Sequence, residues 1–394
     1  MKKICLKILC ALSAVCLLPF QSVKAEDPNH LTDDIISDYA LIMSADTGQI
    51  LGDKNGYEKL YPASMTKMLT CITALDLNPD LNETVEITPE MLAGLKEANA
   101  SVAGFEIGDT PSIQDLLYGS AIPSGADASN ALAYHFAGSI DAYVDLMNQK
   151  AQEIGMTNSH FVNVTGLHDD NHSSTAYDIS LLLQYCLKND TFTKIFSSHD
   201  YTSSTGLSFR QTAWSLIDDG DYVLPAYRGG KTGFTDAAGH CMASWDEING
   251  RTYIVVTGHA QTDLEIPSHM DDLYTILSHM TQLNMYSLMK KDTAIDGIVV
   301  KGPWTDKVVS VIAPEDFNYE AAEEPEAQIT TDLPDHVSDS LEDQTYEGTI
   351  TITSDNKVLH QCSVSVMIPK EDNSFLRLLL QIRDFFHQKI NAAG

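Results

Sequence analysis

The sequence predicts an α+β domain, an antiparallel sheet flanked by helices, followed by a small all-β domain. Residues 26–290 have strand signals at both ends and helical periodicity between them, which indicates a sheet assembled from distant parts of the chain. After residue 290 the signals are those of short strands. With 394 residues, 43% of them hydrophobic and 20% charged, the chain can bury a sizeable core in two or three domains.

The charge balance excludes one broad class of function. The chain has 55 acidic residues against 24 Lys and Arg, a formal charge of −31. A nucleic-acid-binding protein needs a basic face for phosphates. We therefore expect no nucleic-acid partner.

Residues 1–25 have the pattern of a secretory signal peptide. Three lysines in the first seven residues precede an apolar run over 8–20, and Val23-Lys24-Ala25 forms a small-x-small cleavage site. An uncleaved membrane anchor is the alternative. No later segment is apolar enough to span a bilayer. The sequence thus predicts a secreted protein that works outside the cytoplasm.

The four cysteines after the leader are far apart and form no C-x-x-C pair. A domain with a large core does not need disulfides. We expect all four to be buried thiols rather than zinc ligands or nucleophiles: Cys71, Cys186, Cys241 and Cys362.

Local patterns predict the elements of the first domain in order. Residues 39–44 and 49–51 read as a hairpin with its turn at Gly48. Asn249-Gly250, between strand-like runs at 241–245 and 252–257, is a strong signal for a second hairpin. Helical periodicity is expected after residue 64 and over 112–118, 129–154, 176–188 and 268–290.

The region 291–370 is expected to be the small β domain. Its strands are predicted at 298–301, 307–312, 349–353 and 362–368. Residues 315–347 contain twelve acidic residues and no Lys or Arg, which favours a solvated loop. A cation-binding role for this stretch is the alternative.

Ser64 and Lys67 form an S-x-x-K motif just after Pro62, at the start of a predicted helix. Residues three apart share a helix face, so the amine can reach the hydroxyl. A hydroxyl becomes a good nucleophile only when a base removes its proton. Lysine can be that base if burial or a neighbouring cation lowers its pKa.

Two further motifs strengthen this interpretation. Residues 229–233, Gly-Gly-Lys-Thr-Gly, precede the second hairpin and offer a cation and a hydroxyl on a strand that another chain can approach closely. This combination suits the carboxylate of an extended peptide. Ser124 follows a proline-broken loop between two predicted helices and could relay protons.

The order of S-x-x-K at 64–67, S-G-x-D-A at 124–128 and K-T-G at 231–233 resembles that of the penicillin-binding serine acyltransferases. Within that group, the chain is similar to the low-molecular-weight D-alanyl-D-alanine carboxypeptidases. The likeness covers roughly residues 35–260. The supporting stretches are 108–119, 156–163, 166–167, 172–178 and 230–239. It implies the penicillin-recognising serine transpeptidase or β-lactamase-like fold, followed by a β domain and a C-terminal amphipathic helix.

The resemblance also implies roles for individual residues. Ser64 would be the acylated nucleophile, Lys67 its general base, and Ser124 a link between the lysines that helps to protonate the leaving amine. The backbone N–H groups of Ser64 and Phe234 would form the oxyanion hole. The implied binding residues for the terminal carboxylate of a peptidoglycan stem peptide or a β-lactam antibiotic are Lys231, Thr232, Gly233 and Phe234. The implied reaction, removal of the terminal D-Ala through an acyl-enzyme, needs no cofactor and no metal.

One position departs from the family pattern. The second motif normally reads S-x-N, and its asparagine contacts the general base and the substrate; here that position is Ala126. Losing such a contact typically costs about 2–4 kcal/mol in the transition state. Asn130 cannot replace it on spacing grounds. A catalytically impaired or inactive penicillin- or peptidoglycan-binding protein is therefore the alternative; a β-lactamase is a weaker one, because its usual S-D-N triplet is absent.

Two segments outside these motifs also suggest functions. His168 and His172 enclose acidic residues, a weak pattern for a metal site. In the tail 371–394, one helix face is apolar and the local charge is basic, which predicts a helix lying in the surface of a membrane. A helix packed on the β domain, or a dimer seam, is the alternative. The apolar face consists of Phe375, Leu379, Ile382, Phe386 and Ile390.

Overall fold

The computed structural model describes residues 29–77, 79–260, 267–302, 305–338, 342–370, 378 and 381–383. They form two compact units, divided between Thr275 and Ile276, with the short segment before Thr32 belonging to the second. The division falls earlier than the expected residue 290. The expected signal peptide, and nearly all of the expected C-terminal helix, lie outside the described residues.

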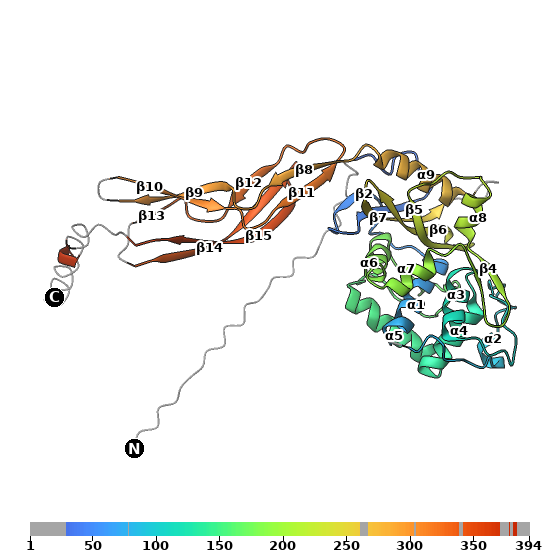
Figure 1. Cartoon of the computed structure of the whole chain (residues 1–394). Coiled ribbons are helices and arrows are strands. Elements are labelled where there is room, and N and C mark those ends of the chain that lie inside the picture. The colour runs from blue at the N-terminus through green and yellow to red at the C-terminus, as the bar shows by residue number, and fades with distance from the viewer. Residues whose placement is uncertain are drawn as a thin grey trace, which may run out of the picture. The chain divides into compact units, whose positions relative to one another are not determined.

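The first unit is built on a five-stranded sheet with helices packed beside it (Figure 1). Its strand order is β2-β1-β7-β6-β5, and every neighbouring pair is antiparallel. Strand β1 near the N-terminus pairs with β7, where Ile42 faces Val255. This pairing and the two hairpins confirm the expected topology. Strand β5 forms one edge of the sheet. The bounds are β1 Tyr39–Ser44, β2 Ile50–Lys54, β5 Tyr227–Thr235, β6 Gly239–Ile248 and β7 Arg251–Ala260.

Helices α3 to α7 surround α1, which is buried from Thr66 to Leu75 and therefore exposes almost no face to solvent. The expected helix over 129–154 is two helices, because Gly138 adopts φ 76° and Ser139 caps the second. A small hairpin, β3 Asp200–Thr202 and β4 Ser208–Arg210, accompanies them. The bounds are η1 Ala63–Met65, α1 Thr66–Asp76, α2 Pro89–Leu92, α3 Ile113–Ala121, α4 Ala126–Ala137, α5 Ile140–Ile154, α6 Ala176–Cys186, α7 Asp190–Phe196, α8 Thr212–Asp218 and α9 Ser268–Met280.

The second unit is made of β-strands around its own apolar core, which includes Val311, Ile350 and Val364. Its sheets have the orders β10-β9-β13, β11-β8 and β12-β14-β15. The bounds are β8 Asn284–Met289, β9 Ala294–Lys301, β10 Lys307–Ile312, β11 Phe317–Ala321, β12 Gln328–Thr331, β13 His336–Ser338, β14 Gln344–Ser354 and β15 Lys357–Ile368.

Three expectations about this part of the chain were wrong. The helix expected over 268–290 ends at Met280, and β8 follows it because its backbone pairs with β11. The acidic stretch 315–347 is not one loop, since β11, β12 and β13 lie in it and pair with strands distant in sequence. Cys362 is only half-buried, unlike the other three cysteines, because it lies in the first part of β15, where no residue from 357 to 363 is buried. No helix among the described residues is long and apolar enough to cross a membrane.

Candidate active site

Ser64 lies in the short helix η1, and Lys67 lies in the first turn of α1, which continues from it. The Lys67 Nζ donates a hydrogen bond of 3.0 Å to the Ser64 hydroxyl oxygen. It donates a second one, of 2.5 Å, to the carbonyl oxygen of Thr165. The spacing of three residues thus brings the two side chains together, as the sequence predicts.

Burial prepares the Lys67 amine to act as a base. The side chain is only 2% exposed. Burial, and then the positive charge of Lys231, hold the pKa of Lys67 well below its usual range. Both effects disfavour the charged form. They therefore favour the neutral amine, the form that can accept a proton from Ser64.

Lys231 lies on β5 with its side chain 3% exposed. Its Nζ donates a hydrogen bond of 2.8 Å to the carbonyl oxygen of Thr232. Burial lowers the pKa of Lys231 to about 8. At neutral pH this lysine keeps its charge, whereas Lys67 is pushed toward the neutral form.

Two glycines allow the backbone around Ser64 to pack closely. A Cβ on Gly233 would lie 2.9 Å from the Ser64 backbone nitrogen, and one on Gly166 would lie 1.8 Å from the Ala63 carbonyl oxygen. Gly166 also has φ 79°. Because these two residues have no side chain, β5 and the 165–168 segment can both pack closely against the turn that carries Ser64, one on each side.

A pocket of about 400 Å³ opens over Ser64 and Lys67. Ala126 and three segments form the rest of its wall: 98–101, 165–168 and 234–237. Phe234 lines the pocket and is 48% exposed. An extended chain lying beside the edge strand β5 could therefore reach the serine hydroxyl.

The second motif is placed beside this pocket by a buried carboxylate. Asp127 accepts hydrogen bonds from the backbone N–H groups of Ala103, Gly104 and Phe105. Ser124 adopts φ 61°, and its buried hydroxyl has no hydrogen-bond partner within the part of the chain that the structure describes. Such an orphaned hydroxyl is a group that a ligand or water can engage.

Ala126 lines the pocket, and its backbone N–H donates to the Ser101 carbonyl oxygen at 2.8 Å. Asn130 is buried away from it, and its side-chain amide donates to the Met91 carbonyl oxygen. Asn130 therefore does not replace the missing asparagine, as its spacing indicates. The Thr165 carbonyl supplies Lys67 with an acceptor instead.

The two histidines of the 168–172 segment have separate surroundings. His172 is buried; its Nε2 contacts the Thr66 hydroxyl at 2.8 Å, and its Nδ1 accepts from the Val162 N–H. Burial lowers the pKa of His172 to about 4. His168 lines the pocket and packs against the ring of Tyr61. His172 thus has a structural role, holding the start of α1.

Sequence reasoning missed two contributors to this site. The Thr165 carbonyl could not be recognised in the sequence, because every residue has a backbone carbonyl. The neighbouring Gly166-Leu167 pair, however, belongs to the pattern on which the family resemblance depends. Asn99, with φ 49°, also lines the pocket. Its segment has no motif that would have identified it.

A serine hydroxyl bonded to a buried, depressed-pKa lysine, beside an edge strand that carries a second lysine, defines a serine-type acyl-transfer site. The chain belongs to the D-alanyl-D-alanine carboxypeptidase family, whose sequence model matches residues 22–262. It is 28% identical over 358 residues to the D-alanyl-D-alanine carboxypeptidase DacF of Bacillus subtilis, covering 86% of this chain and 87% of that protein.

Solved structures show the same fold. The chain superposes on penicillin binding protein 5 from Haemophilus influenzae with a TM-score of 0.66 and 22% identity, covering 85% of this chain and 97% of that one. It superposes on the D-alanyl-D-alanine carboxypeptidase from Mycobacterium tuberculosis H37Rv with a TM-score of 0.57 and 28% identity, covering 64% and 93%. The expected penicillin-recognising α+β fold is therefore confirmed.

Proposed function

We propose that this protein is a serine-type D-alanyl-D-alanine carboxypeptidase that removes the terminal D-Ala from peptidoglycan stem peptides. The observation that carries the proposal is the hydrogen bond between the Lys67 amine and the Ser64 hydroxyl, made in a buried environment that lowers the pKa of the lysine. Membership of the family supports the same reaction. It does not favour the alternative of an inactive binding protein.

The reaction follows from these groups in two steps. Lys67 takes the proton of the Ser64 hydroxyl, whose oxygen attacks the carbonyl carbon between the last two residues of the stem peptide. The C–N bond breaks, the departing amine takes a proton, and D-Ala leaves. Water then hydrolyses the ester on Ser64, releasing the shortened peptide and restoring the hydroxyl. A β-lactam would acylate the same oxygen through its strained amide.

The remaining site residues are assigned to binding and proton transfer. The charge of Lys231 and the hydroxyl of Thr232 would hold the terminal carboxylate beside β5. Gly233 keeps that edge open, and the N–H groups of Ser64 and Phe234 would bind the oxyanion. The orphaned Ser124 hydroxyl would pass a proton to the leaving amine. Because no described residue bonds to this hydroxyl, the structure supports a role for it that begins when substrate arrives.

We further propose that the protein acts outside the cytoplasm, at the outer face of the membrane. The basic and apolar pattern of residues 1–25 supports export through a cleaved signal peptide. The basic amphipathic pattern of residues 371–394 supports attachment to anionic lipid headgroups.

The decisive experiment separates acylation from turnover. The mature protein is incubated with penicillin and examined by intact-mass spectrometry with mapping of the adduct. It is incubated separately with a stem pentapeptide ending in D-Ala-D-Ala, and free D-Ala is measured. We expect a single adduct on Ser64 and continuous D-Ala release. An adduct without D-Ala release, or no adduct at all, contradicts the proposed enzyme.

Ser64→Ala should abolish both signals while leaving the thermal transition nearly unchanged. Ser208→Ala, an exposed serine on β4, is the matched control and should behave as the wild type. An adduct of equal yield on the Ser64→Ala protein would exclude this residue as the nucleophile.

A further inference from the structure

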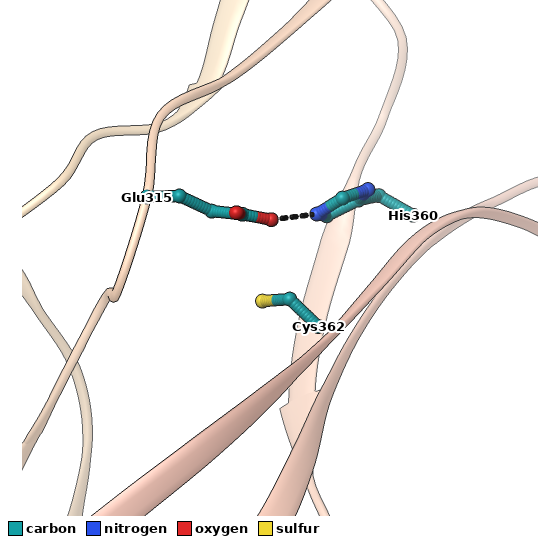
Figure 2. A group of neighbouring side chains, drawn as sticks. All are labelled: Glu315, His360 and Cys362. Atoms are coloured by element: carbon teal, nitrogen blue, oxygen red, sulfur yellow. Dashed lines mark hydrogen bonds and ion pairs between the residues drawn. The ribbon is translucent and has the colours of Figure 1, made fainter.

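Three metal-ligating side chains meet in the second unit, outside the part of the chain that carries the proposed chemistry. They are Glu315, His360 and Cys362, and their ligand atoms all lie within 4.8 Å of one another. Figure 2 shows the carboxylate pointing at the imidazole, with the thiol below them. The Glu315 Oε1 and the His360 Nε2 are 2.8 Å apart. We propose that these residues form a transition-metal site, with Zn²⁺ as the ion it fits best.

Backbone pairing fixes two of the three ligands. His360 and Cys362 are two residues apart on β15, so their side chains point to the same face. Their positions opposite Ile352 and Ile350 of β14 hold that spacing, because both isoleucines are fully buried in the core of this unit. The nitrogen and sulfur ligands are therefore presented side by side by a rigid element.

The third ligand comes from the turn between β10 and β11, which is anchored on both sides of Glu315. The Ala313 N–H donates to the Thr293 carbonyl oxygen at 2.9 Å. On the other side, the Asp316 carboxylate accepts from the Lys291 N–H at 2.8 Å. The turn thus delivers the carboxylate to β15 without depending on its bond to His360.

The imidazole is also held in orientation by an aromatic neighbour. The ring of Phe317 stacks on that of His360, with centroids 4.4 Å apart and planes 10° from parallel. A histidine whose ring is already held in place loses little conformational freedom when it binds a metal. Contacts from neighbouring residues orient the ligands of many metal centres in this way.

The donor set selects the kind of ion. A thiolate and an imidazole suit Zn²⁺ and other late transition metals, whereas Ca²⁺ and Mg²⁺ prefer oxygen ligands only. Zinc bond lengths of about 2.0–2.3 Å in a tetrahedron put ligand atoms about 3.3–3.6 Å apart. The ligand atoms lie within 4.8 Å of one another, and side-chain rotation would bring them to that spacing. Three protein ligands leave a fourth position for water, and the ion would tie the 313–316 turn to β15.

The test uses the mature chain, reduced and freed of metals, with Zn²⁺ and Co²⁺ as probes. We expect one equivalent of Zn²⁺ to bind by titration calorimetry and to raise the thermal transition of the β unit reversibly, with chelator restoring it. Co²⁺ should produce a thiolate-to-metal charge-transfer band that Zn²⁺ removes. No stoichiometric binding, or a cobalt spectrum without a sulfur band, overturns the proposal.

Variants assign the binding to this cluster. Cys362→Ser should abolish the sulfur band and weaken Zn²⁺ binding about tenfold or more. His360→Phe keeps a ring to stack on Phe317 and should weaken binding similarly. Gln361→Ala, on the opposite face of the same strand, is the control and should bind like the wild type. Wild-type affinity in both ligand variants would place the zinc elsewhere and overturn the assignment.

Discussion

The carbonyl oxygen of Thr165 accepts a hydrogen bond of 2.5 Å from the Lys67 Nζ, the same atom that donates to Ser64. Lys67 is therefore aimed at the serine by a backbone group on a distant segment. The asparagine contact with this lysine that the family resemblance implies is absent, because position 126 is alanine. Lys67 thus lies beside Ser64 with a backbone carbonyl, and no side chain at position 126, as its second hydrogen-bond acceptor.

The first prediction concerns pH. Since the pKa of Lys231 is about 8, kcat/KM for a D-Ala-D-Ala peptide should fall about tenfold per unit as the pH rises above that value, because the cation that holds the carboxylate is lost. Lys231→Arg keeps the charge throughout this range. Its kcat/KM should be lower overall, yet should show no such fall up to about pH 10. The test is to measure kcat/KM of both proteins across this pH range. An identical fall in the arginine variant would mean that a group other than Lys231 titrates.

The second prediction concerns Ala126. Ala126→Asn should restore a polar contact in the pocket and raise the rate of acylation by penicillin about tenfold or more, since one such contact is worth about 2–4 kcal/mol. The rate is measured by quenching the acylation reaction at several times and determining the acylated fraction by intact-mass spectrometry. Ala126→Leu adds a side chain of similar size without an amide and should not accelerate the reaction. If the asparagine variant folds and acylates no faster, the Thr165 carbonyl already supplies what the amide would.

The third prediction concerns the buried carboxyl of Asp246 on β6. Burial raises its pKa to about 7, and its Oδ1 has no hydrogen-bond partner within the described residues. Between about pH 4 and pH 7 the folded protein keeps a proton that the unfolded chain has lost, so the free energy of unfolding falls as pH rises. Asp246→Asn, which cannot ionise, should flatten this dependence and stabilise the protein at pH 8 by about 1–3 kcal/mol.

Thermal or urea unfolding at several pH values measures this effect. Glu247→Gln, at the exposed neighbouring position, is the control and should leave the dependence in place. A pH profile that is unchanged by Asp246→Asn would show that this carboxyl does not hold its proton in the folded state.

The fourth prediction concerns the tail. Removing residues 374–394 should shift the mature protein from anionic vesicles to the supernatant in a sedimentation assay, since each bulky apolar side chain that inserts contributes about 1.5–3 kcal/mol. Acylation of Ser64 should be unaffected. Vesicles of neutral lipid are the control and should bind the full chain less. Failure of the full chain to bind anionic vesicles, or loss of folding on truncation, would show that the tail has a structural role.

Much of the fold was accessible from local patterns. The hairpin at Asn249-Gly250 and the strand pair near the N-terminus depend on turn residues and alternation, which act over a few positions. The end of α9 at Met280 and the strands within the acidic stretch were not accessible, because they depend on pairing with distant strands. The weak local preference of these segments for helix or loop is outweighed by backbone hydrogen bonding to strands far away in the sequence.

The sequence by itself determined which residues could carry the chemistry. In any helix, residues three apart lie on the same face, so the spacing of Ser64 and Lys67 was enough to predict that their side chains meet. The K-T-G run at 231–233 was enough to predict the strand that carries Lys231. Only the tertiary structure decided their protonation, because the burial of Lys67 and its nearness to Lys231 come from segments far apart in the chain. The same reason applies to the Thr165 carbonyl and to the cluster at Cys362. Residue types are written in the sequence, whereas desolvation and the meeting of distant groups exist only once the chain has folded.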